Sequence, residues 1–135
     1  MRQDLIFGPL GAMAFLTFVV LVIIPFRRIR ASRAGLVRGK DFKFGESTDV
    51  PGHVAIPNRN YMNLLELPVL FYVVGLMYFV TGRVSMTALI LSWAYVAARF
   101  VHSGIHLTYN NIMHRLAAFT VSNFILIALW VLFFV

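Results

Sequence analysis

Long apolar stretches alternate with polar ones along this chain of 135 residues. Four stretches are apolar almost throughout, at about 5–26, 64–82, 84–104 and 116–135. A helix rises 1.5 Å per residue, so roughly 20 residues cover the roughly 30 Å hydrocarbon core of a bilayer. Alternation with period two, typical of a spanning β-barrel, is missing. The pattern predicts an all-α membrane protein, a four-transmembrane-helix bundle with both termini on one side.

The polar connections between these stretches differ in length. The first, about 27–62, is long and rich in glycine and proline, which argues against a second folded domain there. Its first residues, RRIRASRAGLVR, contain few helix breakers and favour an extension of the first helix. Thr81, Gly82 and Arg83 predict a tight hairpin, and the third connection spans about 105–115. We expect one integral membrane domain over 1–135.

The net charge of +7 belongs to the long connection, because eight of the twelve basic residues lie between positions 27 and 59. A polybasic segment beside a membrane helix is commonly a topology signal or a contact for anionic lipid. We therefore expect membrane lipids, and no nucleic acid, as partners. The positive-inside rule places 27–62 on the cytoplasmic face of a bacterial inner membrane or an endoplasmic-reticulum equivalent. The chain has no cysteine, which excludes disulfides and thiolate sites.

Polar residues are predicted to converge at one end of this bundle. Two stripes with helical spacing and one further arginine reach the same membrane depth: Arg59, Asn63 and Glu66; Arg99, His102 and His106; and Arg115. A charged side chain in the bilayer costs about 2.5–3.5 kcal/mol, so such residues usually face the bundle interior and mark function. We expect Glu66 to face inward, toward Arg99, Arg115 or the cationic group of a ligand.

Structural explanations compete with a functional one at each of these positions. Glu66 is also explained as the structural partner of an interhelical arginine. Arg99 and Arg115 are also explained as interfacial side chains that extend to the lipid headgroups. Asn63 is also explained as a helix cap. His102 and His106 have the spacing of two metal or haem ligands on one helix. The neighbouring arginines would repel a cation, so we predict no metal.

The charges of this group indicate the kind of ligand it suits. Arginine forks bind carboxylates, and a glutamate suits an ammonium group. The site lies beside apolar helices that can hold a hydrophobic molecule. A small zwitterion with several carboxylates fits it better than a metal.

Three sequence features together resemble a known family. The first is the motif R-x-x-x-N-x-x-E followed by proline, formed by Arg59, Asn63, Glu66 and Pro68. The second is R-x-x-H, formed by Arg99 and His102, and the third is Arg115, thirteen residues after that histidine. This combination is similar to the MAPEG family, membrane-associated proteins in eicosanoid and glutathione metabolism. The resemblance implies a homotrimer with glutathione as co-substrate between protomers.

The resemblance also implies residue roles. Arg59, Asn63 and Glu66 contact the polar ends of glutathione, His102 lines the pocket with Arg99 and His106, and Arg115 is the catalytic residue near the sulfur. The family adds an arginine from the end of the first helix, for which Arg27, Arg28 and Arg30 are candidates, and we assign Arg28.

Three departures from the family pattern bear on activity: His106 replaces a frequent tyrosine, and Leu116 and Phe119 stand where prostaglandin synthase has serine and tyrosine. We predict a glutathione-dependent membrane transferase or peroxidase acting on a lipophilic electrophile. The alternatives are a non-catalytic membrane subunit or lipid-binding scaffold of the same fold, and a histidine-ligated metal or haem bundle.

Overall fold

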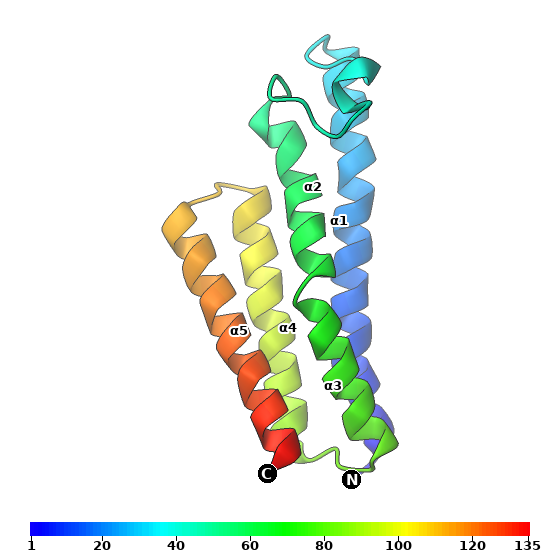
Figure 1. Cartoon of the computed structure of the whole chain (residues 1–135), viewed down its shortest axis with the longest axis vertical. Helices are drawn as coiled ribbons and strands as arrows, with labels where there is room; N and C mark the ends of the chain where they lie inside the picture. Colours follow the sequence, from blue (N-terminus) through cyan, green and yellow to red (C-terminus); the bar gives the residue numbers. More distant parts are fainter.

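The computed structural model describes all 135 residues, which form helices joined by one long connection and several short ones. In chain order the elements are η1 (Gln3–Ile6), α1 (Phe7–Arg33), η2 (Gly39–Phe42), α2 (Gly52–Leu65), α3 (Pro68–Val80), α4 (Met86–Leu107) and α5 (Ile112–Phe134). Figure 1 shows the long helices side by side, with both termini at one end.

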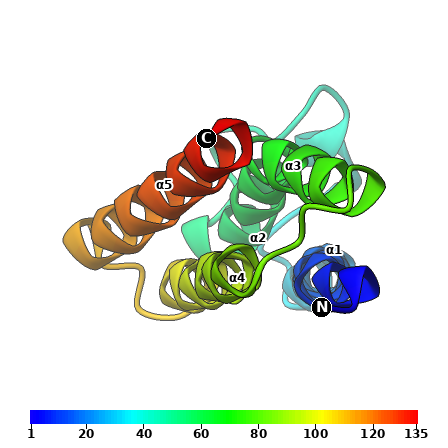
Figure 2. The same ribbon diagram turned by 90° about the horizontal axis from the view of Figure 1, so that it is seen from below.

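Four helical spans are long and apolar enough to cross a membrane: Gln3–Arg33, Gly52–Val80, Met86–Leu107 and Ile112–Phe134. Viewed from the end that carries the termini, the spans form a bundle in which α1 lies beside α4 and α3 beside the end of α5 (Figure 2). The predicted all-α bundle of four transmembrane helices is confirmed.

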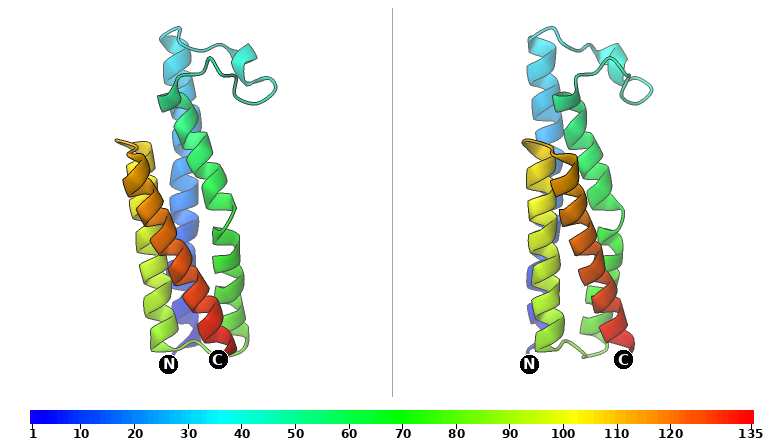
Figure 3. Two further views of the ribbon diagram at one scale, coloured as in Figure 1. Left: turned by 60° about the vertical axis from the view of Figure 1, so that its left-hand side comes forward. Right: turned by 90° about the vertical axis from the view of Figure 1, so that its left-hand side faces the viewer.

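The long first connection is shorter than the predicted 27–62, because helix continues from both sides. α1 runs on to Arg33, as its lack of breakers indicated, and α2 already begins at Gly52. α2 contains Pro57, which the structure accommodates within the helix. The remaining connection, 34–51, lies at the same end of the bundle as the turn 108–111 (Figure 3). We call this the basic end.

The second span is broken rather than continuous. α2 ends at Leu65, and Glu66 leaves the helical region with φ −88° and ψ −104°. α3 restarts at Pro68, its first residue. Inside a helix, proline has no N–H to donate and its ring clashes with the preceding turn. At the first position of a helix there is no preceding turn and no hydrogen bond to donate, so proline is tolerated there. The sequence therefore places Glu66 at a helix break, not inside a helix.

Close packing holds the end opposite the basic end. The Tyr78 hydroxyl donates to the Leu129 carbonyl at 2.9 Å, and Arg83 donates to the Phe133 carbonyl at 2.7 Å. α3 lies so close to α1 that a Cβ built on Gly75 would come within 2.7 Å of Leu10 Cδ2. At the basic end α5 stays beside α4 and diverges from α2 (Figure 1).

Candidate functional site

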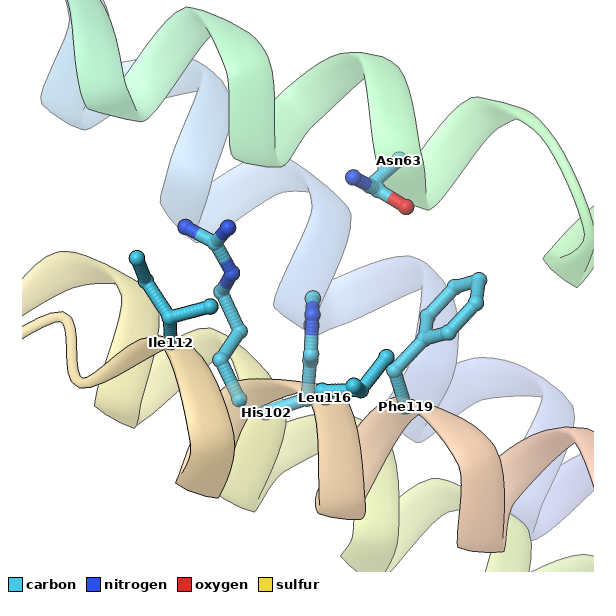
Figure 4. Close-up of a pocket in the computed structure, with 6 residues that line it drawn as sticks. Asn63, His102, Ile112, Leu116 and Phe119 are labelled. Atoms are coloured by element: carbon cyan, nitrogen blue, oxygen red, sulfur yellow. The ribbon is translucent and has the colours of Figure 1, made fainter.

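A cavity of about 220 Å³ lies at the basic end, between α2, α4 and α5. We call it the basic-end cavity. Its lining residues are Asn63 of α2, His102 of α4, and Ile112, Arg115, Leu116 and Phe119 of α5. Figure 4 shows Asn63 across the cavity from the α5 side chains. Three of the predicted site residues, one from each of three helices, thus share one cavity.

The turn between α4 and α5 positions Arg115. Asn111 caps α5, since its side chain accepts a hydrogen bond from the His114 amide at 3.1 Å. Asn110 adopts a positive φ of 47°, a conformation that asparagine tolerates better than most residues. Its side-chain oxygen accepts a hydrogen bond from Arg115 Nη1 at 2.8 Å. The guanidinium is therefore held at the cavity wall, in the first turn of α5, by a single neutral partner.

Two buried imidazoles stand one turn apart on α4. His102 and His106 are 2% and 4% exposed, and their ring centroids are 5.8 Å apart. His102 also lies 5.7 Å from the Phe119 ring. Only His102 lines the cavity, and His106 lies a turn nearer the end of α4. The Nδ1 atoms of both rings are buried and have no hydrogen-bond partner within the chain.

Arg99 is fully buried and acts on the end of α2. Its Nη2 donates to the Asn63 carbonyl at 3.1 Å. Asn63 lies in the last turn of α2, where carbonyls lack helical donors and where a cation complements the helix dipole. The guanidinium also lies 5.7 Å from the Phe119 ring. Arg99 thus supports the backbone of Asn63 from behind and does not line the cavity.

Glu66 and Arg59 are both exposed on the single chain. Neither takes part in an ion pair, and in particular Glu66 makes none with Arg99 or Arg115. Glu66 is the C-cap residue of α2, and its ψ redirects the chain that follows it toward α3. Of the partners expected for Glu66, neither Arg99 nor Arg115 forms an ion pair with it on the single chain, and the cationic group of a ligand stays a prediction.

The three arginines at the end of α1 differ in their surroundings. Arg27 donates to the Leu107 carbonyl and to the His53 carbonyl, each at 3.0 Å. Arg28 pairs with Glu46 at 2.9 Å, and its guanidinium lies 4.4 Å from the Phe42 ring centroid. Arg30 is exposed. None of the three lines the basic-end cavity, and Arg28, the assigned residue, holds the connection 34–51 against α1.

Comparison with known proteins decides the family. A family model described as the MAPEG family matches residues 6–135, nearly the whole chain. The chain belongs to the MAPEG family. It is thus an integral, multi-pass membrane protein related to glutathione and eicosanoid metabolism, in a family that includes non-catalytic members. No curated protein and no solved structure matches the chain.

Two polar residues of this MAPEG protein escaped sequence analysis. Asn60 and Ser103 are 0% and 1% exposed, and the Ser103 hydroxyl donates to the Asn60 side-chain oxygen at 3.2 Å. This bond joins α2 to α4 beside the cavity. Helical spacing could have identified both residues, because Asn60 precedes Asn63 by three residues and Ser103 follows Arg99 by four, which places each on the polar face of its helix.

No group of three or more His, Cys, Asp or Glu side chains in this MAPEG protein is arranged to hold a metal ion. The charged groups near the two buried imidazoles of α4 are arginines: Arg99 and Arg115 act on His102, and Arg115 and Arg59 act on His106. The prediction that the chain uses no metal stays a prediction.

Proposed function

We propose that this MAPEG protein is a glutathione-dependent transferase or peroxidase that acts on a lipophilic electrophile at the basic-end cavity. The main support is one observation: Arg115, His102 and Asn63 share a cavity with the apolar side chains of Ile112, Leu116 and Phe119. Such a cavity offers cationic and amide groups to a charged peptide and an apolar wall to a hydrophobic molecule.

Glutathione, when bound, supplies the thiol that attacks the electrophile or peroxide. Arg115 is the catalytic residue in this proposal, because a neighbouring guanidinium lowers a thiol pKa from about 8.5 and so raises the thiolate fraction at neutral pH. Asn110 fixes the guanidinium through their 2.8 Å bond. His102 faces the same space and orients the peptide.

Asn63, Arg59 and Glu66 bind the polar ends of glutathione in this proposal. Asn63 lines the cavity, and Arg99 positions its backbone. Arg59 and Glu66 are exposed and unpaired on the single chain, so both can reach a ligand that extends out of the cavity. Buried His106, next to the bond between Asn60 and Ser103, supports this wall from α4.

A neighbouring copy of the chain completes the site in this proposal. The cavity of about 220 Å³ is smaller than ligand pockets usually are, which is about 300–1,000 Å³. Glu66 and Arg59 are also exposed and have no ion-pair partner on the single chain. A homotrimer, as the family resemblance implies, would enclose them. The eight basic residues between positions 27 and 59 support a cytoplasmic position for this end, in this proposal at a bacterial inner membrane.

Conjugation of a chlorodinitrobenzene-type electrophile by the purified protein tests the activity. Arg115→Gln is expected to lower the glutathione-dependent rate at pH 7 by at least tenfold, because less thiolate forms. Arg2→Gln removes the same charge at the opposite end and is the matched control. Equal rates for wild type and Arg115→Gln would remove Arg115 from the mechanism.

A non-catalytic subunit or lipid-binding scaffold is the second candidate. Leu116 and Phe119 favour it, since two apolar side chains line the cavity where prostaglandin synthase has hydroxyl groups. Glutathione at 100 times its dissociation constant would stabilise a binding protein by about 2.7 kcal/mol. An unchanged melting temperature at millimolar glutathione would favour the scaffold.

A further inference from the structure

A second cationic surface lies at the basic end, on α1, and shares no residue with the basic-end cavity. Two adjoining hollows of about 290 and 480 Å³ follow the last two turns of α1. Phe26 and Arg30 line both of them. Leu36 and His53 help to close the first, and Ile29 and Arg33 complete the second. We call them together the α1 groove.

Three arginines line the α1 groove: Arg27 bonds to backbone carbonyls, whereas Arg30 and Arg33 have no partner. Arg30 and Arg33 are three residues apart, and so lie on one face of α1. Both are exposed, and neither makes a side-chain hydrogen bond or an ion pair within the chain. None of the five acidic residues lines the groove, and Glu46, on the connection beside α1, is already paired with Arg28. Two guanidinium forks therefore face the same space unneutralised.

The same groove is apolar toward the middle of the membrane. Phe26 and Ile29 are 63% and 53% exposed, and Val22, one turn before Phe26, is 67% exposed. At 1.5 Å per residue the 27 residues of α1 span about 40 Å, more than the roughly 30 Å hydrocarbon core. The last turns of α1 therefore emerge at headgroup level, beyond the ends of α4 and α5 (Figure 3). The arginines at headgroup level and the exposed apolar side chains deeper in the membrane together match an amphiphile that has an anionic headgroup.

We propose that the α1 groove binds one anionic glycerophospholipid. Arg30 and Arg33 hold its phosphate through charge-assisted hydrogen bonds, and its acyl chains lie against Phe26 and Ile29. A zwitterionic lipid fits less well, since its ammonium group would meet the same two guanidinium groups. The groove shares no lining residue with the basic-end cavity of the same chain, and lipid binding is measured without glutathione.

Lipid titration followed by native mass spectrometry tests this site. The full-length protein, in a mild detergent, is titrated with dioleoyl phosphatidylglycerol and separately with dioleoyl phosphatidylcholine. We expect one tightly bound phosphatidylglycerol per chain and weaker phosphatidylcholine binding. Arg30→Gln together with Arg33→Gln is expected to weaken the phosphatidylglycerol affinity by about thirtyfold. The matched control, Lys40→Gln with Lys43→Gln, loses the same charge from the exposed connection and should weaken it less than about threefold.

Each other outcome overturns the proposal. Equal losses in the two double variants would mean a general attraction of anionic lipid to the positive charges at this end of the bundle. Equal binding of the two lipids to the wild type would remove the anionic headgroup from recognition, and this comparison holds even if a variant does not fold. Equal thermal stabilisation by soluble glycerol phosphate would show that the groove takes a free phosphate and not a lipid.

Discussion

Arg27 donates a hydrogen bond to the carbonyl of His53, the acceptor that Pro57 leaves without its helical donor. In a regular helix the N–H four residues later would bond to this carbonyl, but proline has none. The second nitrogen of the same guanidinium bonds to the carbonyl of Leu107, the last residue of α4. Arg27 therefore joins three helices by satisfying carbonyls that their own helices cannot.

Replacing Arg27 should destabilise the basic end. Arg27→Gln is expected to lower the free energy of unfolding by about 2 kcal/mol, because hydrogen bonds to charged groups are worth about 1.5–3 kcal/mol each and these are partly exposed. Arg33→Gln removes an exposed arginine of the same helix that has no partner. It should change the free energy of unfolding by less than about 0.5 kcal/mol. Thermal unfolding in a zwitterionic detergent, without anionic lipid, compares the two. Equal midpoints would contradict a role for Arg27 in joining the helices.

Arg99→Met should separate stability from ligand binding. Burying a guanidinium without a carboxylate costs several kcal/mol, whereas its bond to the Asn63 carbonyl returns only about 1.5–3 kcal/mol. We therefore expect Arg99→Met to leave the unfolding midpoint unchanged or to raise it. Glutathione affinity should fall by about tenfold, because Asn63 loses its support. A large loss of stability together with normal affinity would show that Arg99 is a structural residue only.

The pH dependence of conjugation should distinguish thiolate stabilisation from simple binding. Because Arg115 lowers the thiol pKa of bound glutathione, the wild-type rate should stay high as the pH falls toward 7. The Arg115→Gln rate should fall already below a pH of about 8.5–9 and approach the wild-type rate above it. Rates measured at saturating glutathione from pH 6 to 9.5 give both midpoints. Profiles with one common midpoint would mean that Arg115 acts other than on the thiol.

Two glycines should respond in opposite ways to an added methyl group. Alanine stabilises a helix by up to about 1 kcal/mol relative to glycine, and Gly11, with nothing within 4 Å of its built Cβ, should show this gain. At Gly75 the built Cβ meets Leu10 at 2.7 Å, so overpacking of about 1–3 kcal/mol should exceed the gain. Unfolding midpoints of Gly11→Ala and Gly75→Ala check this. A stabilised Gly75→Ala would contradict the close contact of α1 with α3.

Hydropathy and helical spacing predicted the bundle and the grouping of Asn63, His102 and Arg115. The first follows from the length of apolar helix that a bilayer requires, and the second from the topology that brings three helix ends to one depth. Neither the bundle nor this grouping depends on details of side-chain packing, so both could be predicted from the sequence.

Spacing did not separate the arginines of α1 or place Glu66. Successive residues point about 100° apart around a helix, so the partners of Arg27, Arg28 and Arg30 depend on how α1 is rotated, which packing alone decides. Glu66 is exposed at the end of α2 and forms no ion pair within the chain. Spacing shows which residues share a helix face, but packing decides whether that face points to a partner within the chain or outward.

Calorimetric titration of glutathione tests most directly whether three helices build one peptide site. Wild type, Asn63→Ala of α2, His102→Ala of α4 and Arg115→Gln of α5 are compared, with Arg2→Gln as the charge control at the opposite end. We predict that wild type and Arg2→Gln bind equally and that each of the other three binds at least tenfold more weakly. Undetectable binding by a folded wild type, or wild-type affinity in all three variants, would contradict the account.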